Sequence, residues 1–158
     1  MDIKRFKIQS CSVIVLVLFV SAGFSQQRSD FSGDWILNLN KSKLQANWAT
    51  GLTYGNFKID HQEPNFSLWR TFTIKGKEQV MDFKIPTNGQ KQKGKHKTIW
   101  SLSWEQDTLV FVVQRHEMTI DSVRYSLSAD KKEFIADERV ATPRESYYNR
   151  WVFDKKSQ

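Results

Sequence analysis

The stretch Phe66–Ile74 reads FSLWRTFTI, with Phe, Leu, Phe and Ile at even-numbered positions. Successive side chains of a β-strand point to opposite faces, so this period of two predicts a strand that buries one face. Arg70 is the exception, because it lies in phase with the apolar set and not with the polar one. The stretch therefore predicts a β-sheet with one charged residue directed at its core.

The same period continues on both sides of this stretch. Alternating or continuous apolar runs occupy residues 31–38, 52–60, 81–85, 99–104, 109–113, 123–128, 134–140 and 147–153. Turn residues separate the runs about every 8–12 residues, which is typical of a β-sandwich or a β-barrel. Between Leu39 and Trp48 the pattern lapses, and Asn40 or Ser42 is suited to cap one short helical turn. Because no other segment has a helical period, a parallel sheet with helical crossovers is excluded.

The N-terminal segment has the order of a secretory signal. Basic residues at positions 4, 5 and 7 precede the apolar run Val13–Val20, and Gly23 and Ser25 then supply the small residues of a cleavage site. The alternative is a permanent anchor, which needs about 20 predominantly apolar residues, and this run is shorter. The sequence predicts a cleaved signal over residues 1–25, one domain over residues 26–158, and export to the periplasm or the outside.

Removing this signal changes the chemistry that is available. Cys11 is the only cysteine of the 158 residues, and it precedes the apolar run, where lipid attachment is not expected. The mature chain then has no disulfide, thiolate nucleophile or cysteine metal site. Its net charge falls from +7 to +5, because the signal holds three of the 24 basic and one of the 17 acidic residues. No transmembrane anchor remains after cleavage.

The remaining positive charge is spread along the chain except at residues 91–97, where four lysines alternate with other residues. A solvated hairpin end explains this run, since the tight-turn pair Asn88-Gly89 precedes it. The alternative is a contact with an anionic surface. Because the aromatic residues fit no nucleic-acid-binding motif, no nucleic-acid partner is expected.

Several short motifs resemble one protein family. Residues 31–35 read FSGDW and residues 38–42 read NLNKS, which is similar to the first strand of lipocalins and closer to bacterial secreted lipocalin-like domains. Residues 104–110 and 125–132 resemble two later hairpins of the same group, with Tyr125 and Lys131 where the pattern has Trp and Gly. The resemblance spans most of the chain after the signal. It implies an all-β fold, a closed antiparallel up-and-down barrel of 8–10 strands.

The resemblance also implies a structural contact between the first and last strands. In lipocalins a basic residue of the last strand packs across the tryptophan of the Gly-x-Trp motif, here Gly33 and Trp35. Arg150 is the candidate by position, and a guanidinium stacks well on an indole ring. We expect Trp35 and Arg150 to touch.

The candidates for ligand binding are polar or aromatic residues that the alternation directs inward. An interior arginine needs a carboxylate from the protein or from a ligand, which makes Arg70 the first candidate. The alternatives are that a bulge changes the register of the strand, or that Arg70 lies at the barrel rim with its charged group in solvent. Arg115 and Tyr125 share the phase of apolar neighbours, and Trp100 and Trp104 are either core residues or an aromatic binding wall.

Catalytic and metal-binding signals are weak. The sequence has no Gly-x-Ser-x-Gly elbow and no glycine-rich phosphate loop, and its three histidines are far apart. We therefore assign no catalytic residue, metal or cofactor. The leading hypothesis is an exported protein that binds a small apolar or amphipathic molecule. A ligand-free structural or interaction barrel and, third, a barrel enzyme remain as alternatives, and an enclosed pocket of at least about 300 Å³ favours binding. The oligomeric state stays open.

Overall fold

The computed structural model describes residues 28–157, so the predicted signal lies outside the described residues. Strands make up nearly all of the regular structure. Their bounds are β1 Gly33–Leu37, β2 Lys43–Leu44, β3 Leu52–Gln62, β4 Asn65–Ile74, β5 Lys77–Pro86, β6 Gln92–Lys93, β7 Thr98–Glu105, β8 Thr108–Arg115, β9 Met118–Leu127, β10 Glu133–Ala141 and β11 Ser146–Lys155. Two short 3₁₀ turns, η1 Asn47–Ala49 and η2 Lys95–Lys97, interrupt them.

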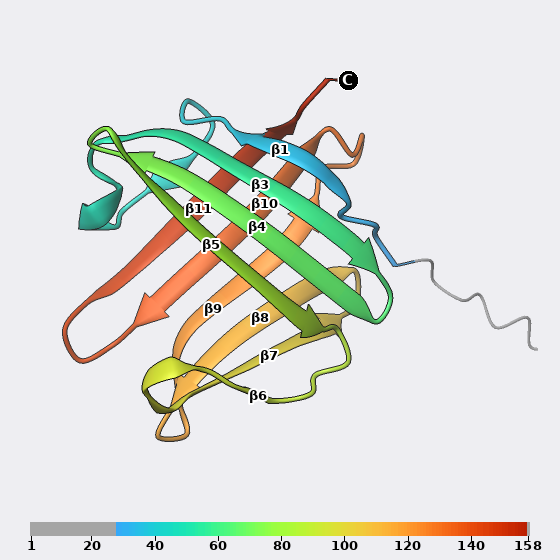
Figure 1. Cartoon of the computed structure of the whole chain (residues 1–158), viewed down its shortest axis with the longest axis vertical. Helices are drawn as coiled ribbons and strands as arrows, with labels where there is room; N and C mark the ends of the chain where they lie inside the picture. Colours follow the sequence, from blue (N-terminus) through green and yellow to red (C-terminus); the bar gives the residue numbers. More distant parts are fainter. Residues whose placement is uncertain (1–27, 158) are drawn as a thin grey trace, which may run out of the picture.

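The strands form one antiparallel meander that curves round on itself (Figure 1). Its order is β5-β4-β3-β1-β11-β10-β9-β8-β7-β6, and the pairing of β1 with β11 joins the first part of the sheet to the last. The two ends of this order meet where β5 lies against β7. After β5 the chain is joined to β7 by the isolated bridge between Asn88 and Ser103 and by the short strand β6. The fold is a nearly closed ten-strand antiparallel barrel, which confirms the predicted fold class.

The core consists mainly of aromatic rings from the inward faces of these strands. Phe134 lies at its centre, with its ring centroid 5.7 Å from Trp35, 5.5 Å from Tyr125 and 5.8 Å from Phe153. Such pairs contribute about 0.5–1.5 kcal/mol each beyond their buried area. Alternating aromatic strands therefore supply the packing that a chain without disulfides needs.

One end of the barrel is closed by a cluster that we call the end plug, formed by Phe31, His61, Glu63, Thr87 and Trp104. The ring of Phe31 is fully buried and stacks on Trp104 at 5.8 Å and on His61 at 5.6 Å. Trp104 Nε1 and Thr87 Oγ1 each donate to the Glu63 carboxylate at 2.6 Å. The N-terminal segment and the β3–β4 turn thus seal this end.

The structure corrects the expected contact between the first and last strands. Trp35 is paired with Lys155, whose ammonium nitrogen lies 5.3 Å from the centre of the indole. Arg150 lies five positions earlier on β11, about 17 Å along the strand, and hydrogen-bonds to Asp137. The prediction of a Trp35–Arg150 contact was wrong. The cation above Trp35 is an ammonium from the strand end, and the preceding Gly33 has a φ of 143°, which residues with a Cβ rarely adopt.

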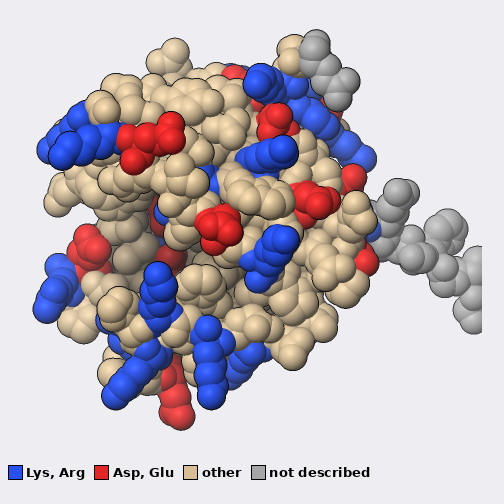
Figure 2. All heavy atoms as spheres, in the orientation of Figure 1, with Lys and Arg blue, Asp and Glu red and all other residues tan. Residues whose placement is uncertain are grey.

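Two loop expectations are also settled by the structure. A short helical turn forms, but at Asn47–Ala49 and without a side-chain cap. Asn38 organises the preceding turn instead, through its Oδ1, which accepts from the backbone N–H of Lys41. The basic run 91–97 forms β6 and η2, and Figure 2 shows lysine and arginine side chains gathered over the lower part of the molecule.

Candidate functional site

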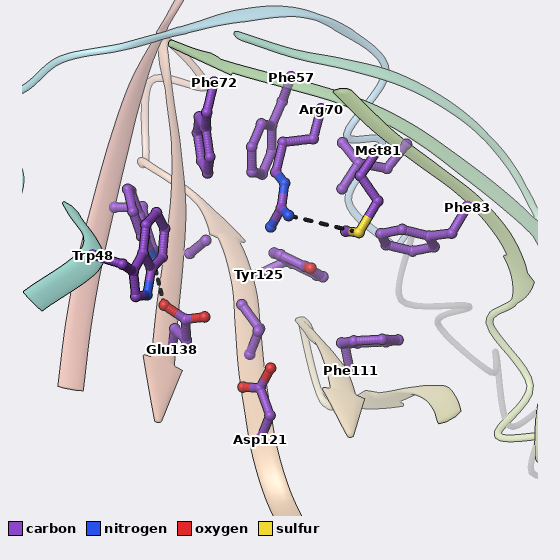
Figure 3. Close-up of a pocket in the computed structure, with 14 residues that line it drawn as sticks. Trp48, Phe57, Arg70, Phe72, Met81, Phe83, Phe111, Asp121, Tyr125 and Glu138 are labelled. Atoms are coloured by element: carbon purple, nitrogen blue, oxygen red, sulfur yellow. Dashed lines mark hydrogen bonds between the residues drawn. The ribbon is translucent and has the colours of Figure 1, made fainter. Parts of the chain in front are cut away.

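A cavity of about 90 Å³ lies inside the barrel, away from the end plug (Figure 3). Three strands direct four polar side chains into it. These are Arg70 from β4, Asp121 and Tyr125 from β9, and Glu138 from β10. The remaining wall is aromatic or aliphatic, formed by Trp48, Phe57, Leu68, Phe72, Met81, Phe83, Phe111, Val123, Ala136 and Trp151. The cavity therefore combines an apolar wall with a small set of converging polar groups.

Arg70 points inward, as its phase in β4 predicts. It pairs with Phe57 on β3 and with Met81 on β5 in an uninterrupted register, so no bulge redirects it. Its guanidinium carbon lies 5.0 Å from the centre of the Phe72 ring, and its one hydrogen bond is a weak one to Met81 Sδ at 3.6 Å. Burial lowers the pKa of Arg70, although an arginine remains charged at neutral pH. Arg70 is thus a cation that no described carboxylate pairs with.

Asp121 faces the same cavity from β9. Its Oδ1 is buried, and no described group hydrogen-bonds to it. Burial, followed by the negative charge of Glu138, raises the pKa of Asp121 to about 7, and the positive charge of Arg70 offsets part of this effect. The carboxyl group therefore changes its charge near neutral pH.

Glu138 is held in place by its neighbours on β11. One carboxylate oxygen, Oε2, accepts from Asn149 Nδ2 at 2.7 Å and from Trp151 Nε1 at 3.0 Å. Asn149 is itself fully buried, and its Oδ1 accepts from the backbone N–H of Gln45 at 2.8 Å. This chain of hydrogen bonds fixes one oxygen of Glu138, and no residue of 28–157 donates to the other.

Tyr125 forms the floor between these groups. Its ring stacks on Phe134 at 5.5 Å and on Phe66 at 6.0 Å, and only 4% of the residue is exposed. Burial, and then the charge of Asp121, raise the pKa of Tyr125, so the phenol is neutral. A neutral hydroxyl in the cavity wall is able both to donate and to accept a hydrogen bond.

Trp48 lies where the cavity wall meets solvent. It is carried by η1, stacks on Trp151 at 5.6 Å and stays 37% exposed. Its Nε1 donates to the hydroxyl of Tyr147 at 3.3 Å. Figure 2 shows the surface hollowed beside η1. An exposed indole at this point makes a natural reporter of anything that enters the cavity.

Three other predicted ligand contacts lie away from the cavity. Arg115 ends β8 and is exposed, and Trp104 belongs to the end plug. Trp100 donates to Thr98 Oγ1 at 3.1 Å and packs against Phe83, which places it on the seam between β5 and β7. Of the five residues predicted to contact a ligand, only Arg70 and Tyr125 line the cavity. The prediction is corrected for Arg115, Trp100 and Trp104. Arg115 lies at the exposed end of β8, after an irregularity in the pairing with β9 between Val113 and Gln114.

Sequence reasoning missed Asp121 and Glu138. Both were within its reach, since Asp121 shares the phase of Val123 and Tyr125, and Glu138 shares that of Ala136. A charged residue in phase with an apolar set is the same signal that identified Arg70.

Residues 28–157 contain no group of three or more His, Asp or Glu side chains that could hold a metal ion. Within the same residues, no helix has the length and apolar character needed to cross a membrane.

No family model matches the chain, and no curated protein matches its sequence. Solved structures do match. A REP1-NXSQ fatty acid transporter superimposes with a TM-score of 0.56 at 10% identity, covering 80% of this chain and 96% of that one. The fold is that of the calycin-type barrels. Zebrafish ileal bile acid-binding protein complexed with cholic acid (TM-score 0.54, 10% identity, 81% and 100% covered) has the same fold. So does a secretory abundant heat soluble protein from Ramazzottius varieornatus (TM-score 0.56, 13% identity, 80% and 95% covered).

Proposed function

We propose that this chain is an exported binding protein that holds a small apolar or amphipathic molecule inside its calycin-type barrel. The observation that carries the proposal is Arg70, a cation without a carboxylate partner beside a cavity with an aromatic wall. Leaving a charge unpaired in such surroundings costs several kcal/mol, and a polar group of a ligand would offset that cost. Two structures of the same fold are named for a fatty acid transporter and for a bile acid-binding protein.

The size of the cavity limits the ligand. The cavity, at about 90 Å³, is well below the about 300 Å³ of a typical small-molecule pocket. It does not reach the volume that was expected to favour binding. A long acyl chain requires side chains to move, and the half-exposed Met81 on β5 is the most accessible of those in the wall. The cavity as it stands suits a compact molecule.

A thermal shift series tests the proposal. Purified protein is heated with decanoate, cholate or a compact amphipathic molecule, and a ligand is expected to raise the melting temperature in proportion to the logarithm of its concentration. Arg70→Met should reduce the shift, while the exposed Arg115→Met serves as the matched control and should leave it unchanged. If no member of the panel shifts the wild-type melting temperature, binding is refuted and the ligand-free barrel module takes its place.

Export is the second part of the proposal, and it rests on the N-terminal sequence alone. The segment 1–25 should be absent from the protein recovered outside the inner membrane of a bacterial host. Mass spectrometry of that protein should give a chain that begins at Gln26. Recovery of the full 158-residue chain from the cytoplasm would contradict the proposal.

A further inference from the structure

The charges inside the cavity do not match those of a simple anion site. Arg70 approaches from β4, and the carboxyl groups of Asp121 and Glu138 lie across the cavity from it on β9 and β10 (Figure 3). Arg70 forms no ion pair with either of them, and all three carry open hydrogen-bonding positions. With both carboxylates ionised, the cavity holds two negative groups and one positive group. Its net charge is then negative.

A lone carboxylate is therefore a poor ligand for this cavity above neutral pH, where Asp121 and Glu138 are both ionised. Contact with the Arg70 guanidinium would be favourable, but it would bring a third negative charge close to Asp121 and Glu138. Like charges in surroundings of low dielectric repel strongly, and an aromatic wall screens them poorly. The ligand needs a positive group as well as a negative one.

The volume sets the size of such a ligand. The cavity measures about 90 Å³, well below the about 300 Å³ of a typical small-molecule pocket, so its ligand has few non-hydrogen atoms. Aromatic faces line it, and the negative face of an aromatic ring attracts a cation. Both properties favour a compact molecule with a cationic group and a short apolar body.

We propose that the cavity binds a compact zwitterion, whose carboxylate contacts Arg70 and whose ammonium group contacts Asp121 and Glu138. The inference rests on the proposed binding function and names the class of its ligand. The ammonium group donates to the unpartnered Oδ1 of Asp121 and to the open oxygen of Glu138, and the guanidinium donates to the carboxylate. Each of the three charges then has a partner of opposite sign.

Three molecules of one shape test the inference. L-valine carries both groups, isovalerate lacks the ammonium group, and isobutylamine lacks the carboxylate. Titration calorimetry of the full mature protein at pH 8 should give L-valine a dissociation constant at least about tenfold lower than that of either analogue, the effect of one charge-assisted hydrogen bond. Isovalerate binding as tightly as L-valine, or more tightly, overturns the inference.

Two variants assign the charges to their partners. Arg70→Met should weaken the binding of L-valine until it binds no better than isobutylamine. Asp121→Asn should bring the dissociation constants of L-valine and isovalerate to within about threefold of each other. The matched controls are Arg115→Met and the exposed Asp60→Asn, which lie outside the cavity and should keep the wild-type ratios. If a control variant no longer binds L-valine more tightly than the two analogues, the assignment of Arg70 and Asp121 to the charges of the ligand is contradicted.

Decanoate separates failure of this inference from failure of the proposed function. If decanoate binds in an Arg70-dependent way and L-valine does not, the barrel binds ligands and the zwitterion class is wrong. If neither binds, the binding function and the ligand class both fall.

Discussion

Glu63 in the end plug and Asp121 in the cavity are two carboxylates among aromatic rings, yet their hydrogen bonding differs. Burial raises the pKa of Glu63, but hydrogen bonds from Thr87, Trp104 and His61 outweigh it and lower that pKa overall. Asp121 keeps a buried oxygen without a partner, and its pKa rises to about 7. A carboxylate whose hydrogen bonds the protein completes contributes to stability. One that the protein leaves open is the contact that we propose for a bound molecule.

The largest expected effect comes from the packing of the end plug. Phe31→Ala removes a fully buried ring that stacks on Trp104 and His61, and it should lower the free energy of unfolding by about 3–5 kcal/mol. Arg70→Met is the comparison, since it removes an unpaired charge from the cavity and should be neutral or stabilising. Urea titrations measure both. A larger loss for Arg70→Met than for Phe31→Ala would reverse the proposed roles of the two regions.

Glu63→Gln tests the hydrogen bonds of the end plug. Thr87 and Trp104 donate to different oxygens of Glu63, and glutamine keeps only one of them, so one donor loses its acceptor and we expect the free energy of unfolding to fall by about 1–2 kcal/mol at pH 7. Because the folded pKa of Glu63 is lowered, its contribution is present above the unfolded pKa and is lost as the pH falls through the lower folded pKa. Wild type and variant should therefore converge in acid, and equal stability at pH 7 would show that the bonds contribute nothing.

Asp121→Asn should have the opposite dependence on pH. The raised pKa means that the folded state keeps its proton when the unfolded state has lost it, so wild-type stability falls as the pH rises from about 4 to about 7. The variant should be about as stable as wild type at pH 4 and more stable than it by a few kcal/mol at pH 8, because one pKa unit corresponds to about 1.4 kcal/mol. Thermal melts at both values check this. A variant that is less stable at pH 8 would show that Asp121 already has a partner.

The groups that act on Asp121 come from several strands. Glu138 on β10 raises its pKa, Arg70 on β4 lowers it, and Tyr125 and Tyr147 are the neutral titratable neighbours on β9 and β11. The melts of Asp121→Asn therefore need Glu138→Gln beside them, because removing that negative charge should lower the pKa of Asp121.

The smallest effect concerns the cation above Trp35. Lys155→Met should cost about 0.5–1 kcal/mol and change the tryptophan fluorescence, because the ammonium group lies 5.3 Å from the indole. Arg150→Met provides the control and should leave the fluorescence of Trp35 unchanged. A spectrum altered by Arg150→Met alone would restore the contact expected from the family resemblance.

The sequence predicted what depends on local alternation. The period of two in Phe66–Ile74 placed Arg70 on the inner face, and Tyr125 followed from the same pattern in β9. Asp121 and Glu138 carried this signal too, but only the barrel shows that their strands face Arg70 across one cavity.

Contacts between distant strands could not be predicted from the sequence alone. The register of β1 on β11 decides that Lys155 reaches Trp35, and no spacing within either strand fixes that register. Trp104 shares a face with Trp100 in β7, yet the β3–β4 turn brings Glu63 to one of them only.

Native mass spectrometry of the protein purified from its own host tests the central claim most directly. We expect wild-type protein to carry a bound small molecule that Arg115→Met retains and Arg70→Met loses, because the unpaired guanidinium holds the polar group of that molecule. Wild-type protein that repeatedly carries no molecule, or one that persists equally on Arg70→Met, would contradict it.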